Sequence, residues 1–296
     1  MAVNTASSAL DIETAWHLIL DAVNRSNVTL VTPGTDQPAL KINGKSWELI
    51  RPATTEARQL LSVFLPLCRP VKPTTSTHVI GQLGQSLDGR IATVTGCSRF
   101  INGDDGITHL HRIRAVCDAV VVGAGTAVTD NPRLTVRRAS GSNPVRVVID
   151  RKRRVPASHH LFTDGAAPTL HLVAGDYQPG QRFAADSHVT VVPCLGDADS
   201  QTPVSPQTIL SVLQDFGLRK IFIEGGGVTV SLFLNAGLLD RLHVMVAPMI
   251  IGSGRPAFSL PEIDQLDDAL RPEAQLINLG SDMLFDLAFP KSQTPH

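Results

Sequence analysis

The segment Glu224–Leu232 combines a carboxylate, three glycines and the start of a helical pattern. The apolar run Ile221–Ile223 predicts a buried strand that ends at Glu224. Gly225–Gly227 follow, and the apolar residues beyond them predict a short helix that stops at Gly237. A glycine turn between a strand and a helix directs free backbone N–H groups toward a phosphate. The pattern therefore predicts a phosphate site, although the same residues also fit a tight turn without a ligand.

A second polar loop, with Asp130 and Arg133, follows the predicted strand that ends at Gly123. Loops at the carboxyl ends of parallel strands are where α/β proteins bind ligands. The alternative is a structural Asp-Asn-Pro turn. Gly123 and Gly125 match two glycines of a dinucleotide-binding fingerprint, but Val128 occupies the place of the third. The sequence therefore argues against an orthodox Rossmann fold.

Four consecutive basic residues, Arg151–Arg154, follow the predicted strand Pro144–Asp150. Arginine donates bidentate hydrogen bonds to phosphate, so this run predicts a contact with an extra phosphate such as the 2′-phosphate of NADP. A solvated run of charge is the alternative.

The remaining reactive residue types form no recognisable catalytic set. His109 and His111 are two apart on a predicted helix and should diverge, and we expect all ten histidines to be non-catalytic. No nucleophile elbow is present. The four cysteines contain no C-x-x-C pair, so we expect neither a disulfide framework nor a metal site.

Composition excludes several classes of function. Of the 296 residues 43% are apolar and 18% are charged, with a net charge of −1. A sequence-independent nucleic-acid binder would carry a basic excess, and the single Tyr and two Trp offer no platform for base stacking. The sequence shows neither a signal-peptide pattern nor a long apolar run, so we expect a soluble, cytoplasmic protein that binds a small molecule.

The order of elements predicts an α/β protein preceded by a small accessory segment. Residues 1–73 predict two amphipathic helices with a hairpin between them at Asn43-Gly44, and a Pro/Thr-rich stretch closes this segment. In residues 74–296, apolar strands alternate with helices, which is typical of a mostly parallel sheet with helices on both faces. The stretch from Leu239 to Phe289 should add antiparallel edge strands.

Six ordered motifs resemble one known family. The sequence is similar to the pyrimidine reductase domain of riboflavin biosynthesis, the RibD C-terminal domain, over about residues 78–290. That family has a dihydrofolate-reductase-like fold. The motifs are QLGQSLDGRIA (82–92), TGCSRFI (95–101), VVVGAGTAVTDNPRLTVR (120–137), PVRVVID (144–150), the glycine turn with its helix, and APMIIGSG (247–254).

The resemblance implies an NADPH-dependent oxidoreductase. The implied reaction reduces the ribosyl group of 5-amino-6-(5-phosphoribosylamino)uracil, or of its 2,5-diamino pyrimidinone analogue, to ribityl. Hydride goes to the sugar carbon attached to nitrogen. A pterin or other pyrimidine reductase of the same fold is one alternative. A non-catalytic NADP-binding module is another, although that reading predicts a damaged glycine turn and Gly225–Gly227 are intact.

The resemblance also implies two sets of binding residues. The implied cofactor contacts are Gly84, Phe100, Thr126, Asp130, Arg151, Gly225, Gly226, Gly227, Val228, Thr229, Val230, Ser231 and Leu232. The implied substrate contacts are Ser98, Arg114, Leu134, Arg137 and Glu224. The two arginines suit a phosphate and Glu224 suits the N–H groups of a pyrimidine. Asp130 is the candidate general acid, whereas Asp88 should shape its turn.

Bifunctional members of the family carry a zinc deaminase domain before the reductase. Such a domain needs H-x-E and P-C-x-x-C signatures, and the first 77 residues contain neither. We therefore expect no deamination and an extension unrelated to that domain. Because relatives of this fold are commonly dimeric, we also expect a homodimer, with an edge strand from the C-terminal region at the interface.

Overall fold

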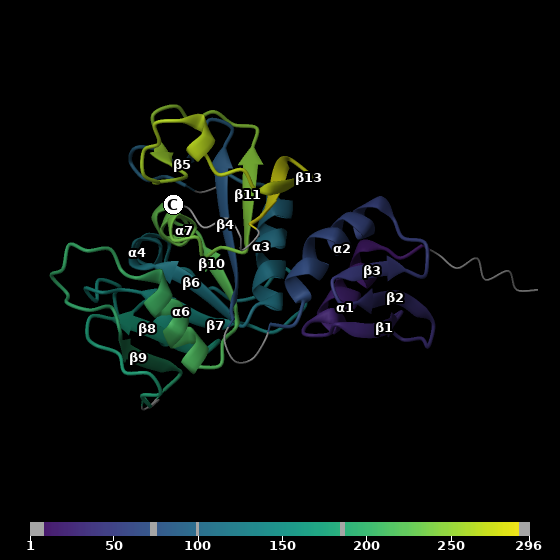
Figure 1. The fold of residues 1–296 in the computed structure, drawn as a ribbon, viewed down its shortest axis with the longest axis horizontal. Coiled ribbons are helices and arrows are strands. Elements are labelled where there is room, and N and C mark those ends of the chain that lie inside the picture. The colour runs from purple at the N-terminus through teal and green to yellow at the C-terminus, as the bar shows by residue number, and fades with distance from the viewer. Residues whose placement is uncertain (1–8, 72–75, 99–100, 184–186, 290–296) are drawn as a thin grey trace, which may run out of the picture. The chain divides into compact units, whose positions relative to one another are not determined.

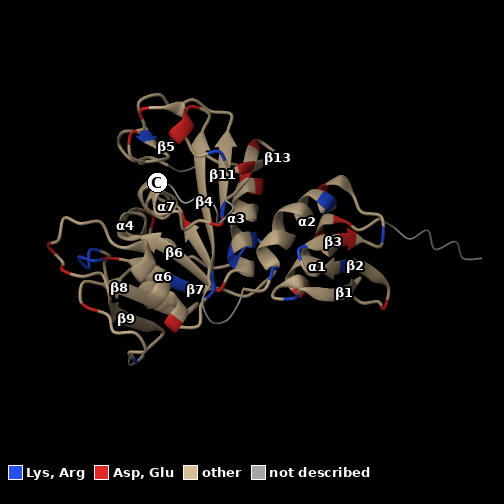
Figure 2. Cartoon of the chain, in the orientation of Figure 1, with Lys and Arg blue, Asp and Glu red and all other residues tan. Residues whose placement is uncertain are grey.

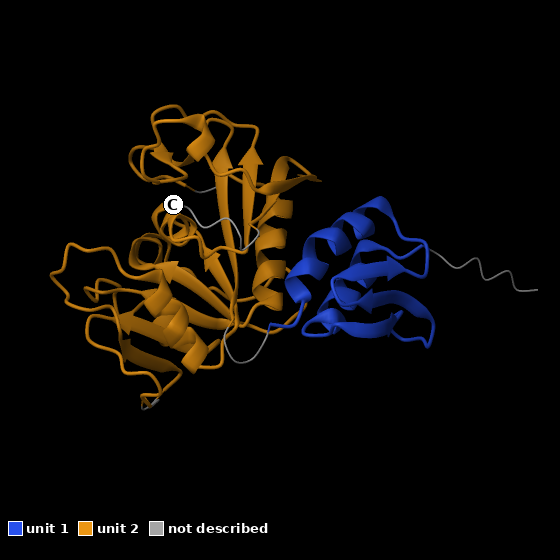
Figure 3. Cartoon of the chain, viewed as in Figure 1, with its two compact units in different colours: residues 1–72 blue, residues 73–296 orange. Residues whose placement is uncertain are grey.

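A computed structural model describes residues 9–71, 76–98, 101–183 and 187–289. The chain divides into two compact units, residues 1–72 and residues 73–296, coloured blue and orange in Figure 3. Each unit has its own helices and its own β-sheet (Figure 1).

Unit 1 packs two helices with a three-stranded antiparallel sheet of order β1-β2-β3. Its elements are α1 (Ile12–Ala22), β1 (Asn27–Val31), β2 (Pro38–Asn43), β3 (Ser46–Leu49) and α2 (Thr55–Cys68). Asp11 caps α1 by accepting the N–H of Thr14 at 2.8 Å. The ring of Trp16 on α1 meets that of Phe64 on α2 edge to face, with centroids 5.4 Å apart, as aromatic pairs prefer.

Both helices predicted for this segment are confirmed, and so is the hairpin. The turn is shifted by one residue, however, because Asn43 pairs with Ser46 and leaves Gly44 and Lys45 as the loop. Gly44, with φ +57°, supplies the left-handed residue that such a turn needs. Strand β1 was not predicted, since NVTLV is short and carries only one fully buried side chain, Leu30.

Unit 2 is built on a nine-stranded sheet, counted over the described residues, with the order β13-β14-β11-β4-β10-β6-β7-β8-β9. Neighbours from β11 to β9 run parallel, and β14 and β13 add antiparallel strands at one edge. The predicted fold class, a mostly parallel mixed sheet flanked by helices, is therefore confirmed.

The elements of unit 2 follow in chain order. They are β4 (His78–Ser86), β5 (Arg90–Ala92), α3 (Asp104–Val116), β6 (Ala119–Gly123), α4 (Ala124–Asp130), β7 (Val145–Ile149), α5 (His160–Thr163), β8 (Thr169–Val173), β9 (Val189–Pro193), α6 (Pro206–Asp215), β10 (Lys220–Glu224), α7 (Gly227–Asn235), β11 (Arg241–Ala247), β12 (Arg255–Pro256), the 3-10 helix η1 (Leu266–Asp268), β13 (Glu273–Leu279) and β14 (Asp282–Ala288).

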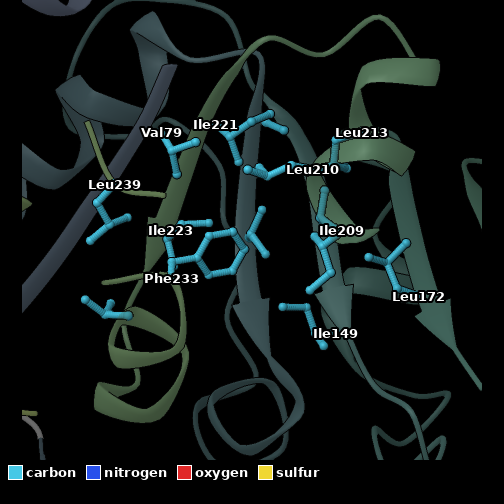
Figure 4. Packing of buried hydrophobic residues seen from close by; sticks show 14 of the residues in the cluster. Val79, Ile149, Leu172, Ile209, Leu210, Leu213, Ile221, Ile223, Phe233 and Leu239 are labelled. Carbon is cyan, nitrogen blue, oxygen red and sulfur yellow. The ribbon is translucent and has the colours of Figure 1, made fainter. Parts of the chain in front are cut away.

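The two faces of this sheet differ because side chains alternate along each strand. On β10, Ile221 and Ile223 join an apolar cluster that includes Phe233 of α7 and Leu213 of α6 (Figure 4). Glu224 points to the opposite face, where α3 lies against β10. We call these the apolar face and the polar face of the sheet.

The helices of the described chain are too short or too polar to cross a bilayer.

Candidate functional site

The glycine turn after β10 requires glycine for both conformation and space. Gly225 and Gly226 have φ +61° and +70°, in the left-handed region that L side chains rarely adopt. A Cβ on Gly226 would lie 2.8 Å from Oγ1 of Thr126, and one on Gly227 would lie 2.4 Å from the carbonyl oxygen of Ala257. Helix α7 begins at Gly227, so its positive end opens on this turn. The predicted strand, glycine turn and helix are confirmed.

The turn after β6 interlocks with the glycine turn. Strands β6 and β10 are parallel neighbours, with Val121 opposite Ile223, so α4 and α7 start at the same edge of the sheet. Thr126 of α4 lies against Gly226, and Thr229 of α7 lies against Gly123, where a Cβ would come within 2.6 Å of its Oγ1. Each threonine thus covers a glycine of the other turn. Close packing against Thr229 therefore explains the glycine at position 123 without a dinucleotide-binding fingerprint.

Glu224 is held at the end of β10 by a buried arginine. Nε and one terminal nitrogen of Arg114 donate to the two oxygens of Glu224 at 2.7 and 2.5 Å. The other terminal nitrogen donates to the carbonyl oxygen of Thr135 at 2.8 Å. Arg114 is 5% exposed and Glu224 9%. This fork geometry fixes the carboxylate in one orientation beside the glycine turn.

The loop after α4 follows an unusual backbone path. Asn131 and Leu134, with φ +42° and +53°, are left-handed although neither is glycine. Leu134 is buried, and it directs the chain back toward α3. There the N–H of Arg137 donates to Nδ1 of His111 at 3.0 Å, and a guanidinium nitrogen of Arg137 donates to Oγ1 of Thr135 at 2.7 Å.

The region around Arg137 carries an excess of positive charge. Burial first, and then the charges of Arg114 and Arg133, lower the pKa of Arg137. The charge of Arg138 also lowers this pKa, whereas the charge of Glu224 raises it. The burial of Arg137 is partial, and much of its surface stays exposed to solvent. A cluster of arginines that disfavour one another's charge is a favourable environment for a phosphate.

The other predicted residues are less closely grouped. Asp130 is exposed at the end of α4, and Ser98 is half-buried in the loop before α3. A Cβ on Gly84 would fall 1.7 Å from Oδ1 of Asn102, so the backbone of β4 admits no side chain there. Arg151 donates to the carbonyl oxygens of Ser200 and Thr202 at 3.1 and 2.7 Å. Phe100 lies outside the described residues.

Asp88 holds a turn, as expected. Its carboxylate accepts the hydroxyl of Ser86 at 2.5 Å and the N–H groups of Ile251 and Gly252 at 3.1 and 2.7 Å. The Ser86 hydroxyl, followed by the Ile251 amide, lowers the pKa of Asp88 to about 2. The carboxylate therefore ties the 86–89 turn to the segment that leads back over the start of α7.

Sequence reasoning missed Thr135, His111 and Asn143 as supports of this site. Thr135 and His111 hold Arg137, while Oδ1 of Asn143 accepts the N–H of Val136 at 2.8 Å. One available signal was the spacing of His111 and Arg114, which are three apart and therefore share a face of α3. The predicted divergence of His109 and His111 is confirmed, since His109 bonds to His243.

Comparison with known proteins decides the family. The family model described as the RibD C-terminal domain matches residues 77–284. The chain belongs to the RibD C-terminal domain family. The predicted resemblance is confirmed.

A curated member from Methanothermobacter thermautotrophicus is named 2,5-diamino-6-ribosylamino-4(3H)-pyrimidinone 5′-phosphate reductase. It is 36% identical over 216 residues, which cover 71% of this chain and 96% of that protein. The riboflavin biosynthesis protein RibD of Aquifex aeolicus is 29% identical over 275 residues, 89% of this chain and 74% of that protein. This match extends beyond the family-model range.

Solved structures of RibD carry the same fold. The match to Acinetobacter baumannii RibD has a TM-score of 0.61 and 26% identity, and covers 79% of this chain and 62% of that one. A Thermotoga maritima deaminase/5-amino-6-(5-phosphoribosylamino)uracil reductase matches with a TM-score of 0.57 and 26% identity, over 79% of this chain and 61% of that one. The chain thus spans about three fifths of the length of these two proteins.

Proposed function

We propose that the chain catalyses NADPH-dependent reduction of the ribosyl group of 5-amino-6-(5-phosphoribosylamino)uracil, or of its 2,5-diamino pyrimidinone analogue, to ribityl. The observation that carries the proposal is the Glu224 carboxylate, fixed by Arg114 between the glycine turn and the arginine-rich 133–138 loop. This arrangement supports a pyrimidine recognised at one end and a phosphate at the other. The names of the Methanothermobacter thermautotrophicus and Thermotoga maritima proteins agree with that substrate class.

The cofactor's pyrophosphate fits the start of α7. The first N–H groups of a helix have no intrahelical partner, and the left-handed Gly225 and Gly226 bring the backbone close to a bound anion. Thr126 adds a hydroxyl on the facing helix. When bound, the dihydronicotinamide supplies the hydride. We propose that residues 225–232 and Thr126 hold and orient this group, as the resemblance implies.

The basic turn Arg151–Arg154 supports NADPH over NADH. Asp150, buried at the end of β7, builds this turn by accepting the N–H groups of Arg154 and Val155 at 2.8 and 3.0 Å. Arg151 bonds to two loop carbonyls, whereas Lys152, Arg153 and Arg154 are exposed. Figure 2 shows Lys and Arg in blue and Asp and Glu in red. We propose that the exposed members contact the 2′-phosphate and that Arg151 supports them.

Substrate recognition divides between a direct and an indirect arginine. The exposed Arg137 is the phosphate ligand in this proposal. Arg114 is buried and uses its donors on Glu224 and Thr135, so we propose that it acts on the substrate through Glu224. Ser98 and Leu134 line the same predicted site. As hydride reaches the sugar carbon, the ring oxygen must take a proton while the ring opens, and Asp130 is the candidate donor.

We also propose a homodimer through the β13 edge. Strand β13 is the last strand of the sheet in the described residues, so one of its hydrogen-bonding edges is available. Leu276 and Phe285 pair across β13 and β14 and are 56% and 39% exposed. Leu266 and Ile263, in the preceding segment, are also exposed. A patch of this kind is typical of an interface between copies. A monomer by light scattering at working concentration would contradict it.

The activity test measures NADPH consumption with and without the phosphoribosylamino pyrimidine. Arg137→Ala should raise KM for the substrate by about 10- to 100-fold, the loss expected for a hydrogen bond to a charged group. Glu224→Gln should also impair turnover. Arg138→Ala is the matched comparison, because it removes a neighbouring exposed arginine that is bonded to Asp104, and it should raise KM much less than Arg137→Ala does. Binding of NADPH without turnover would mean that the substrate belongs to another chemical class. A failure to bind NADPH would refute the proposal.

A further inference from the structure

The loop that carries Arg137 is anchored by side chains. The N–H of Val136 donates to Asn143 and that of Arg137 to His111, while the carbonyl oxygen of Thr135 accepts from Arg114. Loop segments lack the regular backbone hydrogen bonds of strands and helices, so they keep their geometry only where contacts of this kind replace those bonds. The position of Arg137 therefore depends on a few individual hydrogen bonds.

The bond from Arg137 to His111 fixes the state of the histidine ring. A backbone N–H can only donate, so Nδ1 of His111, 3.0 Å from the Arg137 nitrogen, is the acceptor. In the neutral ring the proton then lies on Nε2. Burial first, followed by the charges of Arg114, Arg137 and Arg138, lowers the pKa of His111 to about 4. The ring therefore stays a neutral acceptor at neutral pH.

Helix α3 presents His111 and Arg114 together on this loop. The two residues are three apart and are 2% and 5% exposed. Arg114 holds Thr135 and Glu224, and His111 holds the next turn of the loop at Arg137. One rigid helix thus sets the separation between Glu224, the proposed pyrimidine ligand, and Arg137, the proposed phosphate ligand.

We propose that His111 is a positioning residue that fixes Arg137 for the substrate phosphate through the bond from the Arg137 N–H to Nδ1. This inference rests on the proposed function, in which Arg137 is the phosphate ligand. It gives His111 no contact with substrate or cofactor. Part of the affinity for the phosphorylated sugar then depends on one buried acceptor atom, Nδ1 of His111.

Two substitutions separate the acceptor atom from the volume of the ring. His111→Phe keeps an aromatic ring and removes the acceptor. His111→Asn offers an amide oxygen as acceptor close to the Cβ, as Nδ1 is. We expect His111→Phe to raise KM for the phosphorylated substrate by about tenfold, which corresponds to one hydrogen bond. The value of kcat and the Kd for NADPH should change less than about twofold, and His111→Asn should restore most of the KM.

A double-mutant cycle with Arg137→Ala tests whether His111 acts through Arg137. If it does, His111→Phe should change KM by less than about twofold once Arg137 is alanine. Three results would overturn the inference: an unchanged KM in His111→Phe, an effect that remains in the Arg137→Ala background, or a joint loss of kcat and NADPH binding. A failure of His111→Asn to restore KM while the variant stays folded would also count against it.

Binding of ribose 5-phosphate, measured by calorimetry, separates this inference from the proposed function. Affinity that falls in both Arg137→Ala and His111→Phe would support the positioning role even if no pyrimidine is reduced, and the proposed function alone would fail. Affinity that falls in Arg137→Ala but not in His111→Phe would overturn the inference and leave the function intact. The absence of both turnover and Arg137-dependent binding would overturn both.

Discussion

The two faces of the large sheet of unit 2 differ in what their buried side chains contribute. The apolar face packs strand residues such as Ile221 and Ile223 against apolar side chains of α6 and α7. The polar face buries the pair of Glu224 and Arg114 where α3 lies against β10, and it buries Arg146 beside α5. Apolar contacts stabilise a fold without demanding one orientation, whereas a buried ion pair is tolerable only in good geometry. Orientation is therefore controlled on the polar face, which is also where the proposed substrate ligands lie.

The polar face extends well beyond the site. Fully buried Arg146 donates to Thr169, Asp164 and Ala167 at 3.0, 2.7 and 2.7 Å. At the other end of the sheet, Nε2 of His109 lies 2.9 Å from Nδ1 of His243. The opposite nitrogen of His243 lies 3.2 Å from Asp286. The second network joins α3 to β11 and β14, which makes the helix a rigid support for His111 and Arg114.

The largest effect should come from separating Arg114 and Glu224. Arg114→Leu leaves Glu224 as an uncompensated buried charge, so we expect a loss of about 3–5 kcal/mol in the free energy of unfolding together with loss of turnover. The double variant Arg114→Leu/Glu224→Leu should recover most of that stability and none of the activity. Chemical denaturation and NADPH consumption measure the two quantities. A double variant that stays as unstable as the single one would contradict the account.

On the apolar face, Leu213→Ala should affect stability alone. Leu213 is fully buried on α6, so truncation removes apolar contacts and leaves a cavity, at a cost of about 2–5 kcal/mol. Glu224, Arg137 and the glycine turn keep their contacts, so kcat and KM should stay within about twofold under conditions where the variant is folded. A kinetic defect as large as that of Arg137→Ala would mean that the two faces are not separable in function.

The dependence of the free energy of unfolding on pH should also differ between variants of the polar face and variants of the apolar face. Burial first, and then the nearby His243, lowers the pKa of His109 well below that of a free histidine. The unfolded chain therefore binds a proton below about pH 6.5 that the folded chain does not, and stability falls as pH falls. His109→Gln should remove about 1.4 kcal/mol per pH unit from that slope. Leu213→Ala is the control, because it should lower the whole curve in parallel. Equal slopes for wild type and His109→Gln would be the contrary result.

Local sequence signals were enough to predict the framework of unit 2. The spacing of Ile107, Leu110 and Ile113 predicts a helix over residues 104–116, and α3 has these bounds in the structure. The run from Ile221 to Gly237 predicts the central strand, its turn and its helix, because each step has its own residue types. The antiparallel edge strands expected between Leu239 and Phe289 are confirmed by β13 and β14. The bounds of β13 were not predicted, because its residues alternate weakly and most of its side chains are exposed. An edge strand depends on its neighbour, and the neighbour is not visible in a local pattern.

The contacts that complete the site could not be predicted in the same way. Arg114 and Glu224 are 110 residues apart, and their pairing depends on α3 lying against β10. The left-handed backbone at Leu134 has no sequence signal, because tertiary contacts impose it on a residue that does not favour it. The family resemblance supplied Arg114 and Arg137, but it did not predict that one would be buried and the other exposed.

The smallest effect should come from an exposed ion pair of nearly the same length as a buried one. Arg138 approaches Asp104 to 2.6 Å and Arg146 approaches Asp164 to 2.7 Å, but the Arg138 side chain is 45% exposed and the Arg146 side chain 0%. Water screens the first pair and competes for its hydrogen bonds, so Arg138→Ala should change the free energy of unfolding by less than about 1 kcal/mol. Denaturant titration at low and high salt measures it. A loss as large as that of Arg114→Leu would show that distance, and not burial, decides what an ion pair contributes here.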